Sequence, residues 1–228
     1  MSKDYRQRMG FSRKDEFHKW VSCKDILIPN WQLIEARNTR LIEVFGKINE
    51  QLPIKYEGDI KDDIWRCYNS VKANNLLPKM RNQGRAMEQV YLTWLIGYMA
   101  EKVFTPFIVD KLILSGLERN GGDDLSSIDT FKRTGAADLV DTNLNIFIDV
   151  QCGTGEGVAT IKKHKVDQAV KIGGTTYAAL FGLMTGTYAM IKLNDLNESK
   201  DVHFYANPSW ENQLCWDVPQ DKFKNWYA

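Results

Sequence analysis

Hydrophobic and polar positions alternate with helical spacing from Trp31 to Leu52. The apolar residues there recur at intervals of three and four, at Leu33, Ile34, Leu41, Ile42, Val44, Phe45 and Ile48. Beyond this stretch, Pro53, Gly58 and Pro78 interrupt the helical pattern. The pattern predicts that residues 1–84 form a mostly helical portion with irregular joints.

A second helical pattern begins just after Gly84. One apolar stripe contains Met87, Val90, Tyr91, Trp94, Leu95 and Tyr98. At about 100° per residue the stripe continues to Glu101, where a carboxylate is costly unless another group pairs with it. Glu88 is expected at the flank of the stripe, within reach of water. We expect the helix to bend or break near Pro106 and to continue to Leu117.

The spacing of hydrophobic residues then changes from that of helices to that of β-strands. A strand-like segment over 127–140 ends in Ala137-Asp138-Leu139-Val140, and turn-forming residues follow at 141–143. The next segment, 144–151, is rich in β-branched and aromatic residues. The two segments therefore predict a β-hairpin.

A crossover is predicted after the hairpin. A glycine-rich loop over 153–157 leads to a helical pattern over 158–172, and apolar runs at 177–184 and 188–193 are suited to buried strands. A strand–helix–strand order gives a parallel pair, so the predicted sheet is mixed: antiparallel at the hairpin and parallel afterwards.

These elements predict one α/β domain over residues 1–228, with a mixed central β-sheet flanked by helices. We divide it into a helical N-terminal portion (1–84), a core (85–193) and a loop-rich, aromatic C-terminal portion (194–228), which contains Trp210, Trp216 and Trp226. The length suits one large domain.

Composition narrows the class of function. Thirty Lys and Arg against 29 Asp and Glu leave a net charge of +1, which excludes a simple polycation but permits a basic cleft offset by acidic surface elsewhere. Four separated cysteines and three scattered histidines favour free thiols in a reducing cytoplasm over a zinc site. The apolar region 90–114 carries too many charged residues to span a membrane, and the N-terminus does not resemble a signal peptide. We expect a soluble cytoplasmic protein.

Two acids carry the candidate chemistry. Asp138 and Asp149 lie near the ends of two adjoining strands, which run about 4.8 Å apart. Convergent carboxylates suit Mg²⁺, which can lower the pKa of an attacking water and stabilise charge on a phosphate. Register decides whether the two side chains converge. Aspartates at strand ends also serve turns, and that structural interpretation stays open.

At these residues the chain resembles the PD-(D/E)XK nucleases, in particular type II restriction endonucleases, over roughly residues 95–193. Ala137-Asp138 corresponds to the first acid, and Asp149-Val150-Gln151 to the acid-x-Lys triplet. The resemblance implies a restriction-endonuclease-like fold, Mg²⁺ held by Asp138 and Asp149, and a supporting role for Glu101 on the preceding helix. Gln151 stands where the family has Lys, so it can orient water by hydrogen bonding but brings no charge. An inactive copy is the competing interpretation.

A cationic cluster comes after the triplet. Lys162, Lys163, His164 and Lys165 lie near a predicted helix start, where positive charge opposes the helix dipole, which favours contact with DNA phosphates. Any of the three lysines could supply the charge that Gln151 lacks. Lys132 and Arg133 are further candidate phosphate contacts. The glycine-rich loop lacks a Gly-Lys-Ser/Thr ending, so a nucleotide cofactor is not expected.

The sequence thus predicts a Mg²⁺-dependent type II restriction endonuclease acting on double-stranded DNA, with residues 1–84 gripping DNA or dimerising. Enzymes of this kind usually form homodimers on palindromic sites. Two rivals stay open: a structure-selective nuclease of the junction-resolvase or repair type on the same fold, and a DNA-binding protein without catalysis.

Overall fold

The computed structural model of the chain describes residues 30–77, 87–119, 136–153, 159–208 and 212–226. The chain divides into a first unit of residues 1–107 and 121–136 and a second unit of residues 108–120 and 137–228. The division falls inside helix α5 (Met87–Leu112). It therefore groups residues 85–107 with the N-terminal helices and residues 194–228 with the sheet.

The first unit is helical where it is described, as the sequence predicts. Helix α3 (Trp31–Gln51) begins at Asn30, whose side chain accepts a hydrogen bond from the Leu33 amide. Helix α4 (Ile60–Ala73) begins at Asp59 in the same way. Both helices bury one apolar face, which consists of Ile34, Leu41, Val44, Phe45 and Ile48 in α3 and of Ile64, Cys67 and Val71 in α4.

Helix α5 differs from the predicted amphipathic helix. Its buried residues cover most of its circumference and include Leu92, Ile96, Ala100 and Val103 beside the predicted stripe. Glu88 is consequently buried rather than exposed at a flank, and its Oε1 accepts a hydrogen bond from the Asn30 amide at 2.8 Å. The helix continues through Pro106 and ends at Leu112, not at Leu117.

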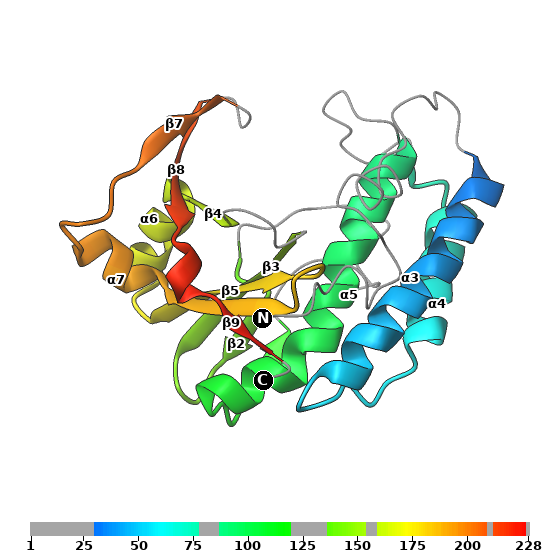
Figure 1. The fold of residues 1–228 in the computed structure, drawn as a ribbon, viewed down its shortest axis with the longest axis horizontal. Helices are drawn as coiled ribbons and strands as arrows, with labels where there is room; N and C mark the ends of the chain where they lie inside the picture. The colour runs from blue at the N-terminus through cyan, green and yellow to red at the C-terminus, as the bar shows by residue number, and fades with distance from the viewer. Residues whose placement is uncertain (1–29, 78–86, 120–135, 154–158, 209–211, 227–228) are drawn as a thin grey trace. The chain divides into compact units, whose positions relative to one another are not determined.

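The second unit contains a mixed six-stranded sheet, which confirms the predicted class. Its strand order is β1-β2-β3-β5-β6-β9, and β3–β5 is its one parallel pair among the described residues (Figure 1). The strands are β1 (Leu117–Arg119), β2 (Leu139–Asp141), β3 (Ile146–Gly153), β5 (Thr175–Gly182), β6 (Thr187–Lys192) and β9 (Lys224–Asn225). The crossover gives the predicted parallel pair, β3 and β5, whereas the next strand, β6, returns antiparallel to β5 through a tight turn.

The crossover between β3 and β5 contains a strand as well as a helix. The predicted helix over 158–172 is shorter: β4 (Ala159–Lys162) comes first, and α6 (Lys163–Ile172) begins after it. Gly173, at φ 75°, ends α6 in the left-handed conformation that glycine adopts readily. The Cβ of an alanine at Gly174 would lie 2.6 Å from the Asn145 carbonyl oxygen, so this glycine permits close packing against the hairpin turn.

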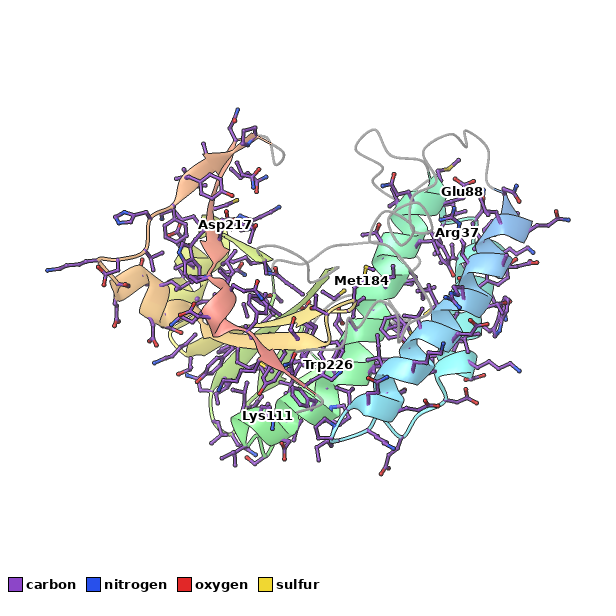
Figure 2. All side chains as sticks on the ribbon, in the orientation of Figure 1. Arg37, Glu88, Lys111, Met184, Asp217 and Trp226 are labelled. Carbon is purple, nitrogen blue, oxygen red and sulfur yellow. The ribbon has the colours of Figure 1, made fainter. Side chains whose placement is uncertain are left out.

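A second sheet of three strands, in the order β4-β8-β7, was not predicted. Strand β8 (Gln213–Val218) pairs antiparallel with both β4 and β7 (Tyr205–Asn207). Asp217 of β8, labelled in Figure 2, accepts hydrogen bonds from Thr160 at 2.9 Å and from Tyr205 at 2.8 Å. The C-terminal portion therefore contributes strands β7, β8 and β9, together with the short helices α7 (Leu193–Glu198) and η3 (Gln220–Lys222).

One core lies between the sheets and helices α6 and α7. Its buried members are Ile161, Val166, Ala169, Ala178, Leu180, Ala189, Ile191, Leu193, Leu196 and Val218. Burial of these apolar side chains supplies the main favourable term that holds α6 on the sheet. Across the described segments, no helix has the length and hydrophobicity needed to cross a membrane.

Candidate active site

The open end of the hairpin β2–β3 brings the two predicted acids close together. Leu139 of β2 pairs with Ile148 of β3, and this is the last pair of the antiparallel ladder. Asp138 directly precedes Leu139 and lies just outside β2, and Asp149 directly follows Ile148 in β3. The two aspartates are therefore neighbours at this end of the hairpin.

A hydrogen bond fixes Asp138 against the neighbouring strand. Its Oδ2 accepts from the Val150 amide of β3 at 2.7 Å. A bond between an ionised carboxylate and a backbone amide is short and strong for its class. Asp138 precedes β2 and is half-buried, and this bond holds it at the level of residues 149 and 150 of β3.

Asp149 is buried beside a lysine. Only 6% of the residue is exposed, and its Oδ1 lies 3.0 Å from the Nζ of Lys165 in the first turn of α6. A buried carboxylate is strongly unfavourable without a hydrogen-bonded partner. Lys165 is that partner, and its own side chain keeps 27% exposure.

Gln151 shares a face with Asp149, because residues two apart along a strand point the same way. In the parallel ladder with β5, Asp149 pairs with Ala178 and Gln151 with Leu180. Both of these β5 residues belong to the core that α6 helps to cover. The strand thus directs its acid and its amide toward the side of the sheet from which Lys165 comes.

The cationic cluster at the start of α6 is present, but its members differ in their surroundings. Lys162 ends β4 and immediately precedes the helix. Lys163 forms an ion pair with Asp167 at 2.5 Å and lies 5.9 Å from the centre of the Phe204 ring. His164 is exposed on this turn. Partial desolvation of the ring and the positive charges of Lys162 and Lys165 lower its pKa below the ordinary histidine value.

The remaining predicted site residues are Glu101, Lys132 and Arg133. Glu101 belongs to the first unit, where it is 8% exposed on α5, and its supporting role stays a prediction. Lys132 and Arg133 fall outside the described residues. Sequence reasoning did not find the Asp217 cluster on the second sheet, because Thr160 and Asp217 are 57 positions apart and no motif links them.

Two neighbouring carboxylates are a set of ligands that suits Mg²⁺. This ion takes one or two carboxylates from a protein and completes its shell with water and phosphate oxygens. Across the described segments, no group of three or more His, Cys, Asp or Glu side chains gathers as a metal cluster. Asp138, bonded to the Val150 amide, and Asp149 place two carboxylates at this end of the hairpin, which is the kind of donor that such an open site needs.

Comparison of the chain with protein families, with curated proteins and with solved structures finds no match. Function is therefore inferred from the residues and geometry of the hairpin.

Proposed function

We propose that the protein is a Mg²⁺-dependent deoxyribonuclease of the type II restriction endonuclease kind, which hydrolyses phosphodiester bonds in duplex DNA. The observation that carries this proposal is the closeness of Asp138 and Asp149 at the open end of the hairpin β2–β3, where Leu139 pairs with Ile148. The Asp138–Val150 hydrogen bond supports it, because it holds the first acid next to the second.

Each residue has a stated role in the proposal. Asp138 and Asp149 hold the cation, which when bound supplies positive charge to acidify water and to neutralise the phosphate. Gln151, on the same face of β3, orients the attacking water by hydrogen bonding. Glu101 keeps the supporting role that the resemblance implies. The fold in this proposal is restriction-endonuclease-like.

We assign the contacts with the DNA duplex to the positively charged side chains around the site. Lys162, Lys163, His164 and Lys165 at the start of α6 face phosphates, together with Lys132 and Arg133. Sequence readout and dimer formation fall to residues 1–84 and 203–228, outside the core. Two active sites meet the two strands of a palindromic duplex through a twofold homodimer.

The direct test is incubation of the purified protein with plasmid DNA and Mg²⁺, followed by sequencing of the ends. We expect discrete fragments whose ends share one short motif. Asp138→Asn and Asp149→Asn should abolish cleavage, whereas Asp195→Asn, which removes an exposed acid of α7, should not. Cleavage of branched DNA alone would instead indicate a structure-selective nuclease. DNA binding without cleavage under Mg²⁺ or Mn²⁺ would indicate a non-catalytic DNA-binding protein.

A further inference from the structure

The hairpin brings two carboxylates together but carries no positive charge of its own. Residues 138–151 contain neither lysine nor arginine. Neighbouring carboxylates repel each other, and a cleavage reaction adds negative charge at the phosphate. A cation must therefore reach this site from another element of the fold.

Helix α6 supplies that cation. Lys165 is the lysine whose Nζ lies 3.0 Å from Asp149 Oδ1. Lys163, two positions earlier on the helix, forms its ion pair with Asp167 instead. The structure thus pairs Lys165, at the start of α6, with Asp149 of the proposed site.

We propose that Lys165 has two roles: it is the counter-ion of Asp149 before a metal binds, and it contacts the scissile phosphate when DNA and Mg²⁺ are present. This inference rests on the proposed function. The long lysine stem lets the ammonium move from the carboxylate to a nearby phosphate oxygen without unfolding the helix. The partial exposure of Lys165, at 27%, leaves its ammonium accessible from solvent.

The two roles have opposite consequences when the charge is removed. The ammonium competes with a divalent cation for the same carboxylate, so its removal should tighten Mg²⁺ binding. The same removal takes a positive charge away from the phosphate, so cleavage should slow. A lysine that only held the fold together would not give tighter metal binding together with slower cleavage.

The experiment compares Lys165→Gln with Lys171→Gln, which removes an exposed lysine from the same helix. Mg²⁺ is titrated calorimetrically into each protein without DNA. Single-turnover cleavage of the mapped plasmid site is then measured at saturating Mg²⁺. For Lys165→Gln we expect Mg²⁺ affinity to rise about tenfold and cleavage to fall about 10²- to 10³-fold. Lys171→Gln should match the wild type in both.

Two further measurements guard against a trivial loss of fold. Lys165→Gln should melt below the wild type in EDTA, and saturating Mg²⁺ should close that gap, because the divalent ion replaces the missing counter-ion. The double variant Gln151→Lys/Lys165→Gln returns a cation to the same face of the site from β3. We expect it to recover at least tenfold of the lost cleavage rate.

The outcomes separate this inference from the proposed function. If the wild type cleaves DNA and Lys165→Gln cleaves at the same rate, the phosphate contact is overturned while the nuclease proposal stands. Unchanged or weaker Mg²⁺ binding by a folded Lys165→Gln protein overturns the counter-ion role. If the wild type does not cleave any DNA, the proposed function and the phosphate contact fail together, and the Mg²⁺ titration still decides the counter-ion role.

Discussion

The two ends of the hairpin β2–β3 each hold a buried aspartate, and the two are satisfied in different ways. At the turn end, Asp141 has no exposed surface and accepts from backbone amides: Ser115 at 2.7 Å, Gly116 at 3.0 Å and Leu144 at 3.0 Å. At the open end, Asp149 is held by the side chain of Lys165. One acid is thus bound by the backbone and the other by a movable ammonium.

The difference separates a structural acid from an acid suited to chemistry. Backbone amides cannot leave Asp141 unless the chain around it unfolds, so the carboxylate keeps these three partners as long as the hairpin is folded. The amides of Gly116, Ser115 and Leu144 lower the pKa of Asp141 below its ordinary value. Asp149 can exchange its partner, because the lysine stem is flexible and an incoming divalent cation takes the place of the ammonium beside the carboxylate. Burial alone therefore does not identify a site; the kind of partner does.

Asp63 of the first unit shows a third arrangement. This acid is 2% exposed and is held by three side chains at once, those of Lys102 at 2.6 Å, Tyr56 and Arg66. Burial raises its pKa, but these partners outweigh that effect and hold the pKa below the ordinary value. Two cations and a hydroxyl already satisfy its oxygens, which makes it a structural acid that joins α4 to α5.

The largest expected effect concerns cleavage. Asp149→Asn should reduce the single-turnover cleavage rate by about 10³-fold or more, because it removes one of the two carboxylates that we propose hold the metal. Asp141→Asn should retain the wild-type rate per folded molecule. Rates are normalised to the folded fraction measured by circular dichroism. A folded Asp149→Asn protein that cuts within tenfold of the wild type would remove this residue from the site.

The next effect concerns stability and its pH dependence. Asp141→Asn should melt at a lower temperature than the wild type at neutral pH, because an amide cannot replace a carboxylate that accepts from three backbone amides. The folded pKa of Asp141 lies below the unfolded value of about 3.9, so its contribution is full above that pH and is lost as pH falls through the folded value. The stability gap between wild type and variant, from urea unfolding, should therefore narrow below about pH 4. A gap that widens on acidification would contradict this assignment.

A smaller effect is expected from the packing of the turn end. Gly174→Ala places a Cβ 2.6 Å from the Asn145 carbonyl oxygen, so the backbone must shift. We expect a loss of about 1–3 kcal/mol in the free energy of unfolding, with cleavage by the folded protein unchanged. Gly153→Ala is the matched control, since its Cβ would have open space around it. Equal stabilities for the two variants would show that the turn end is less tightly packed.

The smallest effect concerns DNA affinity beside the open end. Lys162→Ala should flatten the dependence of log K on log salt by about 0.9 units, the loss of one phosphate contact. Lys163→Ala should flatten it less, because Asp167 already neutralises this lysine. Binding is measured by fluorescence anisotropy over a salt series without Mg²⁺. Identical slopes for wild type and Lys162→Ala would make Lys162 an ordinary surface residue.

Local patterns predicted the hairpin and its two acids well. The β-branched run before Asp149 and the turn formers after Val140 are near neighbours in the chain, so their pairing follows from the residues themselves. The mixed sheet and helices α3 and α5 were also predicted from periodicity, and α4 lies in the portion that was predicted as mostly helical. The resemblance to nucleases and the assigned functional roles stay predictions.

Strand pairing between segments far apart in the chain could not be predicted from the sequence. Residues 159–162 form a strand because β8, more than 50 positions later, pairs with them, and that partner is absent from any local pattern. The start of α6 at Lys163 follows from that strand, and it sets which lysine faces Asp149. The sequence therefore offered three candidate lysines without a choice between them. Glu88 was misplaced because the prediction assumed that α5 has a solvent-facing side.

The most direct test of the central claim is the anomalous diffraction of crystals grown with Mn²⁺ in place of Mg²⁺. The account predicts an anomalous peak about 2.0–2.6 Å from a carboxylate oxygen of both Asp138 and Asp149, with the Lys165 ammonium moved off Asp149 Oδ1. Full Mn²⁺ occupancy at any other place, with the Asp149–Lys165 ion pair intact, would contradict it.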